Sequence, residues 1–302
     1  MSTLTTCTAA TRPAAPFLQD GDTLFETDTK RIITWDANAT TWNIYNSDGS
    51  FNPNVNIPNT SAMHFDGTDD ILTCTGNSRL NISGDVTMAG WINHTGAITS
   101  WSGLISWGEG SSRKSRSLGL NGSDRLCFNS WGAHFSQQGD TVMTVDGQWH
   151  HIACTIRANG TGIRLFLDGV RDHGPSTFDG GGPIDPYVYN TTEIGGAYTP
   201  GAAYFTQGNI DEVSVWDKYL DEAEIAEISS SRSGYDLTAN NAAYVSSSDL
   251  KGWWRMGDGT GDTTTLIKDL STTNPLLQND MVPSGALAPN NTPQFTSVTM
   301  PF

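Results

Sequence analysis

The sequence is poor in positive charge: 16 Lys and Arg stand against 32 Asp and Glu, which gives a formal net charge of −16. A surface this acidic repels nucleic acid and anionic membranes, because both carry negative charge themselves. The chain also has no apolar run that approaches the roughly 18 residues of a membrane-spanning helix. We therefore expect neither nucleic acid nor a membrane as a partner.

The N-terminus, "MSTLTTCTAATRPAAP", lacks the basic start and the apolar stretch of a secretory signal, so no such signal is expected there. Cysteine is scarce as well, and the spacing of Cys7, Cys74, Cys127 and Cys154 matches no zinc motif. The last three lie among apolar strand residues, in "ILTCT", "RLCFN" and "HIACTI". They predict small buried thiols that stay reduced, which is typical of assembly in a reducing cytoplasm.

Helical periodicity is rare, whereas the chain has 32 glycines and many short β-branched or aromatic segments between Gly, Asn, Asp and Ser residues. This pattern predicts an all-β fold, an antiparallel β-sandwich. One segment, "LDEAEIAEISSS", reads as a short helix, with Asp221 as N-cap and Glu224 completing a capping box. Ile225 and Ile228 would then dock this helix on the sandwich.

The chain divides into two parts. Residues 1–50 begin with a Pro-rich arm and continue with "DTLFETDTKRIITWD", two alternating segments around the turn "TDTK". We expect a β-hairpin here, and, because an isolated hairpin is marginal in water, a module for attachment or oligomerisation. Residues 51–302 form the second part, in which strands follow one another at sandwich spacing from Ser61.

Seven motifs carry a family resemblance over residues 61–230. They are "MHFDGTDDILT", "VTMAGWIN", "GLISWGEG", "GQWHHIACTI", "IRLFLDGV", "IGGAY" and "GNIDEVSVWDKYLDEAEIAEI", in this order. Together they resemble the laminin G-like members of the concanavalin A-like jelly-roll superfamily, which implies a jelly roll over 51–302. In many such domains a strand like "GWWRMGDG" precedes the "FDG" strand, but here it follows the helix, at 250–280. We interpret it as a permuted strand, because too few residues remain for a second sandwich.

The N-terminal module, the jelly roll and the "GWWRMGDG" tail together carry a second resemblance. The combination is similar to virion structural proteins of tailed marine bacteriophages. It implies a non-enzymatic capsid decoration, head-fibre or tail-fibre subunit in the virion, assembled in the host cytoplasm. Its partners would be other virion proteins bound through the N-terminal arm, and copies of itself, with a trimer favoured. The alternatives are a carbohydrate-binding lectin or adhesin for host-surface glycans, and a glycoside hydrolase or lyase of the jelly-roll class.

The adjacent acids Asp211 and Glu212 bear on the hydrolase alternative. Jelly-roll glycosidases carry their two catalytic acids at even spacing on one strand, so that both side chains face the sugar. Asp211 and Glu212 are consecutive, and strand alternation places them on opposite faces. We therefore predict no catalytic residue.

Three loops are rich in carboxylates: "DGTDD", "DGTGD" and "FDGGGPID". Asp and Gly are ordinary turn formers, so no cofactor is expected. Calcium is the alternative, since it binds carboxylate oxygens, and its first candidate site is Asp66, Asp69 and Asp70.

Ten tryptophans are present. Trp101, Trp107 and Trp131 flank glycine-containing loops, which predicts a rim that contacts carbohydrate or a protein partner. Four others lie in alternating strands and are predicted to be core residues: Trp91, Trp149, Trp216 and Trp253.

Overall fold

A computed structural model describes residues 59–284, apart from 76–78, 97, 99–100, 109–114, 131–134, 144–145, 178–190, 197–203 and 231–234, together with the backbone of six strands outside that range. Within these described parts, no helix combines the length and the apolar character that crossing a membrane requires.

The N-terminal part forms a sheet of its own. It consists of β1 (Thr5–Cys7), β2 (Thr23–Glu26), β3 (Arg31–Asp36), β4 (Thr41–Tyr45) and β5 (Phe51–Asn52), hydrogen-bonded in this order. Strands β2 and β3 are antiparallel and lie on either side of "TDTK" in the sequence, and β4 pairs with β3. The predicted N-terminal hairpin is confirmed, within a sheet of five strands.

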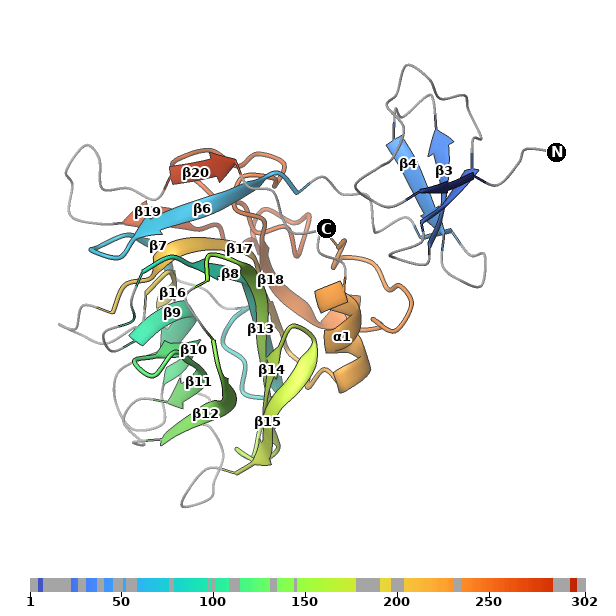
Figure 1. Cartoon of the computed structure of the whole chain (residues 1–302). Helices are drawn as coiled ribbons and strands as arrows, with labels where there is room; N and C mark the ends of the chain where they lie inside the picture. Colours follow the sequence, from blue (N-terminus) through green and yellow to red (C-terminus); the bar gives the residue numbers. More distant parts are fainter. Residues whose placement is uncertain are drawn as a thin grey trace.

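Two antiparallel sheets make up the rest of the fold (Figure 1). The seven-stranded sheet runs β12 (Phe135–Val142), β11 (Arg125–Ser130), β10 (Ser115–Asn121), β9 (Trp101–Gly108), β16 (Thr191–Ile194), β7 (Ile71–Thr75), β19 (Val282–Ser284). The eight-stranded sheet runs β15 (Val170–Ser176), β14 (Ile163–Leu167), β13 (Trp149–Ile156), β8 (Val86–His94), β17 (Gln207–Trp216), β6 (Ser61–Asp66), β20 (Gln294–Ser297), with β18 (Leu250–Trp254) also paired to β17. The predicted β-sandwich is confirmed.

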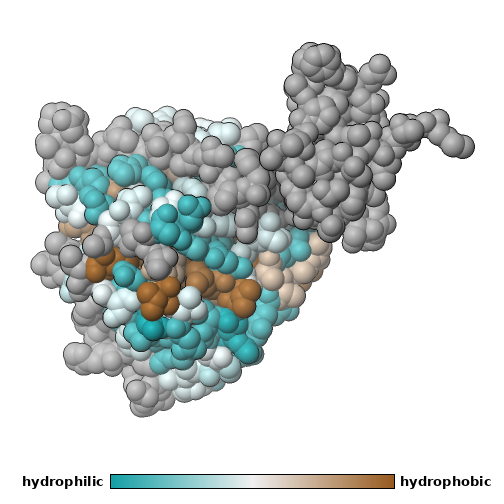
Figure 2. Space-filling model, in the orientation of Figure 1, coloured by the Kyte–Doolittle hydropathy of each residue, from teal (hydrophilic) through white to brown (hydrophobic). Residues whose placement is uncertain are grey.

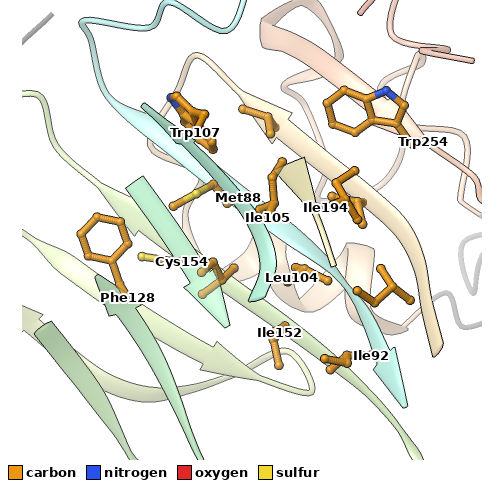
Figure 3. Close-up of a cluster of buried hydrophobic side chains, with 14 of the residues drawn as sticks. Met88, Ile92, Leu104, Ile105, Trp107, Phe128, Ile152, Cys154, Ile194 and Trp254 are labelled. Atoms are coloured by element: carbon orange, nitrogen blue, oxygen red, sulfur yellow. The ribbon is translucent and has the colours of Figure 1, made fainter. Parts of the chain in front are cut away.

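The main hydrophobic core fills the space between the two sheets. Met88 and Ile152 from the eight-stranded sheet, and Ile105 and Phe128 from the seven-stranded sheet, point into it (Figure 3). All four are fully buried. Because strand side chains alternate, the residues between these core positions lie on the outer faces of the sheets.

A second hydrophobic cluster covers the outer face of the eight-stranded sheet beneath helix α1 (Glu222–Ser230) (Figure 1). It includes Trp216 from β17 and Ile225 and Ile228 from the helix. The Asp221 carboxylate accepts hydrogen bonds from the amides of residues 223 and 224, both at 2.9 Å. The Asp221 amide donates to the Glu224 carboxylate at 3.2 Å, which confirms the capping box. A short 3₁₀ helix (Ser247–Asp249) leads from this region into β18.

The C-terminal segment supplies strands to both sheets. Strand β6 pairs with residues 207–210 of β17, whereas β18 pairs with residues 213–216. Since β8 pairs along both halves of β17, β6 and β18 lie end to end on the other side of that strand. Strand β19 pairs with β7. The segment that was interpreted as a permuted strand is therefore built into the sandwich.

The three described cysteines, Cys74, Cys127 and Cys154, are free and buried, as predicted. Burial raises the pKa of Cys74 and of Cys127 to about 11, so both thiols stay protonated and unreactive at neutral pH. The side chain of Cys7 lies outside the described residues.

The described surface is mainly hydrophilic. Figure 2 shows one face of the molecule, on which hydrophilic residues surround a compact group of hydrophobic ones. The exposed large hydrophobic residues are Val142, Val170, Val245, Leu276, Leu277 and Val282. Exposed apolar residues are common on protein surfaces, so we look for a binding face among polar side chains.

Candidate functional site

The structure brings together the three aspartates of the "DGTDD" turn. Asp66 ends β6 in the eight-stranded sheet, and Asp70 directly precedes β7 in the seven-stranded sheet, so this turn links the two sheets. One carboxylate oxygen from each of Asp66, Asp69 and Asp70 lies within 4.8 Å of the other two.

The environment of Asp70 fits a cation at this turn. Its side chain is buried, and one carboxylate oxygen accepts a hydrogen bond from the Asp66 amide at 3.0 Å. The other oxygen is buried and has no hydrogen-bond partner among the described residues. Burial, together with the neighbouring charges of Asp66 and Asp69, raises the pKa of Asp70. A set of donors made only of oxygen suits Ca²⁺, which would compensate this concentration of negative charge.

The other two acidic loops do not form such a cluster among the described residues. The Asp258 carboxylate accepts hydrogen bonds from the amides of Thr60 and Ser61, at 2.7 and 2.8 Å. The Asp262 carboxylate accepts from the amides of three residues in its own loop, Gly257, Gly259 and Lys268. Asp262 thus acts as a turn former, whereas Asp258 connects its loop to the start of β6. Asp179 and Asp185 lie outside the described residues.

The predicted tryptophan rim is wrong for Trp101 and Trp107. Both belong to β9, and they are only 6% and 0% exposed. Trp107 points into the main core (Figure 3), and Trp101 packs against Cys127 and Tyr204. Neither offers the exposed ring face on which a sugar stacks, because the residues beside the glycines are strand, not loop. Trp131 lies outside the described residues, whereas Trp91, Trp149, Trp216 and Trp253 are buried as predicted.

The adjacent acids Asp211 and Glu212 do not follow simple alternation. The register of β17 against β8 shifts between Asp211 and Ser214, and Glu212 has a φ of 50°. This β-bulge inserts an extra residue, so the expectation that the two carboxylates face fully apart is wrong. Burial raises the pKa of Asp211 well above its usual value, and repulsion from Glu212 adds to the shift.

Glu212 is held by a buried ion pair. Its carboxylate accepts hydrogen bonds from Trp253 Nε1 at 2.6 Å and from Arg255 Nε at 2.8 Å. Asp211 is fully buried, and Glu212 and Arg255 are 8% and 4% exposed. Both acids are thus enclosed within the protein, and the Glu212 carboxylate is hydrogen-bonded to Trp253 and Arg255.

A row of polar side chains crosses the outer face of the seven-stranded sheet. Strand pairing places Thr73 opposite Glu193, Glu193 opposite Ser106, and Ser106 opposite Ser117. It continues from Ser117 to Asn129 and from Asn129 to Ser136. We call these six residues the polar row: Thr73, Glu193, Ser106, Ser117, Asn129 and Ser136. Six adjacent strands thus present a hydroxyl, an amide or a carboxylate at one level of the sheet.

The polar row faces away from the core. Its members alternate along their strands with core residues such as Leu72, Ile194, Ile105, Leu118 and Phe128. Ser106 and Ser117 are buried near its middle, Thr73, Glu193 and Asn129 are half-buried, and Ser136 is exposed at its end. The row therefore runs from a sheltered centre to an open edge.

Glu193 is the acid of this row. Burial raises the pKa of its carboxyl group. In the part of the chain that the structure describes, the Glu193 carboxylate has no hydrogen-bond donor and no ion-pair partner. Within the same described part, the buried Ser117 hydroxyl also has no hydrogen-bond partner. Polar groups that are sheltered and unpaired on a sheet face indicate a place where a polar ligand binds.

Glu193 was not among the predicted site residues, although it directly precedes the motif "IGGAY". Alternation in this segment separates Glu193 from Thr192 and Ile194, which are buried. That signal assigns Glu193 to the outer face but does not identify the strands beside it.

The chain belongs to the concanavalin A-like lectin/glucanases superfamily. The family model, of laminin G type, matches residues 66–226, just over half of the chain. No curated protein sequence is significantly similar to this chain.

Several solved structures are similar to this chain. A candidate carbohydrate-binding protein from Bacteroides ovatus is 14% identical with a TM-score of 0.56, over 93% of this chain and 70% of that one. A heptameric SAP-like pentraxin from Limulus polyphemus is 14% identical with a TM-score of 0.43, over 57% of this chain and 82% of that one. The CBM40 of a Ruminococcus gnavus sialidase, bound to α2,3-sialyllactose, is 11% identical with a TM-score of 0.44, over 57% of this chain and 99% of that one. At these identities the likeness concerns the fold alone.

Proposed function

We propose that the protein is a non-catalytic carbohydrate-binding module that holds a glycan on the outer face of its seven-stranded sheet. The observation that carries this proposal is the polar row. Sugars present many hydroxyl groups, and the row offers hydroxyls, an amide and an unpaired carboxylate on adjacent strands. Neighbouring strands lie about 4.8 Å apart, so one ligand lying across them can meet several of these groups.

The description of the Bacteroides ovatus protein as a candidate carbohydrate-binding protein supports the proposal, since it shares this fold over most of both chains. A fold hosts many functions, so this likeness is secondary to the polar row. Among the alternatives from the sequence, the lectin is thus better supported than the virion protein.

We propose that the protein binds its glycan without cleaving it. Glycoside hydrolysis needs two carboxyl groups across the sugar, roughly 5–10 Å apart. The polar row contains a single acid, Glu193. Asp211 and Glu212 are both buried, and Glu212 forms an ion pair with Arg255. Both observations support a binding role for this face.

We include calcium in the proposal as a structural ion, which Asp66, Asp69 and Asp70 would hold at the turn between the sheets. With Ca²⁺ at 100 times its dissociation constant, the gain of about 2.7 kcal/mol corresponds to a Tm rise of roughly 5–10 °C. Calorimetry with Ca²⁺ and with chelator measures this rise. We expect Asp69→Asn to abolish it and Asp85→Asn, outside the cluster, to keep it. Equal Tm values with and without Ca²⁺ would contradict the site.

A glycan array followed by calorimetric titration tests the proposed function. We expect the protein to bind glycan, and Asn129→Ala to weaken binding about 3- to 10-fold, the loss of one or two hydrogen bonds. The matched control is Asn209→Ala, because Asn209 is also half-buried in a strand but belongs to the eight-stranded sheet. An equal loss in both variants, or no glycan bound at all, would argue against the proposed face.

The role in a phage virion stays a prediction. It rests on the resemblance of the N-terminal module and the tail, as do the virion partners and the oligomeric state. The two roles are compatible, since a fibre or decoration subunit can also bind glycan.

A further inference from the structure

We infer that Glu193 determines the specificity of the polar row: it selects uncharged glycans that present adjacent hydroxyl groups, and it rejects acidic glycans. The inference rests on the proposed function, because it names the class of ligand for the same face. It follows from the neighbours of Glu193 and from the charge around it.

The two hydroxyl groups beside Glu193 do not serve its carboxylate. Thr73 on β7 and Ser106 on β9 flank it on the two neighbouring strands. The Thr73 hydroxyl donates to the carbonyl of Val282 at 3.5 Å, and the Ser106 hydroxyl donates to the carbonyl of Gly196 at 3.2 Å. Each hydroxyl has a single proton, so neither has one left for Glu193. Among the described residues, therefore, none donates a hydrogen bond to this carboxylate, which leaves it able to accept from a ligand.

The charge around Glu193 is not compensated either. The other five members of the polar row are neutral side chains. Burial alone accounts for the raised pKa of Glu193, so no cation of the described residues stabilises its charge. Arg125 on β11 directs its guanidinium to the carbonyls of Gly139 and Asp140. A ligand carboxylate at this face would therefore meet an unpaired negative charge on a chain whose net charge is −16.

A pair of adjacent sugar hydroxyls fits these requirements. A carboxylate has two oxygens, so it can accept one hydrogen bond from each hydroxyl, and bonds to a charged acceptor are stronger than neutral ones. A site with an unpaired buried acceptor discriminates strongly against ligands that cannot donate to it. Glu193 thus both attracts hydroxyl donors and repels anions.

The experiment compares wild type with Glu193→Gln on neutral oligosaccharides, each paired with its sialylated or uronic-acid counterpart. We expect wild type to bind the neutral members at least 10-fold more tightly. Glu193→Gln keeps the shape of the side chain but removes its charge. In this variant the affinity for neutral glycans should fall at least 10-fold, and the ratio of the affinities for neutral and acidic glycans should fall by a similar factor. The control is Glu227→Gln on the helix, which should change neither quantity, and circular dichroism confirms folding of both variants.

A pH titration adds a readout that a purely structural role would not move. The ionised carboxylate accepts two hydrogen bonds, so neutral binding should be complete above the raised pKa of Glu193 and fall as the pH drops through it. The facing residues on β7 and β9, Thr73 and Ser106, do not titrate in this range. Glu193→Gln should lack this step.

The outcomes separate the two claims. If wild type binds glycans but prefers the acidic members, or if Glu193→Gln keeps both affinity and preference, the inference fails and the proposed function stands. If wild type binds no glycan, both the proposed function and the inference about Glu193 fail.

Discussion

Replacing Arg255 by Met is expected to lower the free energy of unfolding by about 3–5 kcal/mol, because it leaves a buried carboxylate without its cation. The partner is Glu212, whose Oε1 accepts a hydrogen bond from Arg255 Nε at 2.8 Å. Both side chains are almost fully enclosed. Trp253 Nε1 donates to the other oxygen, but a neutral donor does not neutralise the charge. Urea denaturation followed by circular dichroism measures the effect.

The double variant Glu212→Gln with Arg255→Met tests the cause. It removes both charges, so we expect it to be more stable than Arg255→Met alone, as replacement of a whole buried pair often is. Lys218→Met is the surface control, since Lys218 and Asp249 form a half-exposed pair at 3.7 Å that is worth less than about 1 kcal/mol. A double variant no better than the single one would show that packing, and not charge, explains the loss.

Local patterns in the sequence predicted the elements that depend on local interactions. The Glu224 amide donates to the Asp221 carboxylate, and the Asp221 amide donates to the Glu224 carboxylate. Because these residues lie three positions apart, the start of the helix can be predicted without knowing the rest of the fold. The same holds for the hairpin around "TDTK", whose strands are adjacent in the sequence. Alternation likewise assigned Trp91 and Trp216 to buried positions, because both lie inside long strands.

Features that depend on pairing between distant strands escaped prediction. Glu193 lies beside Thr73 and Ser106 only because β16 is placed between β7 and β9, and nothing in its own segment specifies that order. The bulge at Glu212 breaks alternation where the sequence has no glycine to mark it. Burial, and then repulsion from Glu212, raise the pKa of Asp211 at this bulge.

The C-terminal segment should have the second large effect. Trp254→Ala is expected to cost about 3–5 kcal/mol, the usual range for a buried aromatic residue replaced by alanine. Trp254 is fully buried in the main core (Figure 3), and its Nε1 donates to the carbonyl of Asn279 at 2.9 Å. It lies on β18, which pairs with β17, a central strand of the eight-stranded sheet. Chemical unfolding monitored by circular dichroism should show one transition with a much lower midpoint.

This experiment also tests the interpretation of 250–280 as a permuted strand of the sandwich. If the segment belonged to a separate domain, Trp254→Ala would leave the main transition in place and shift or remove a second one. Leu276→Ala is the control within the same segment, because Leu276 is 91% exposed and its truncation should change stability by no more than about 0.5 kcal/mol. Strands β18 and β6 pair with the same side of β17. Because the loss of Trp254 destabilises β18, and with it this sheet, we expect the whole sandwich to unfold in one transition.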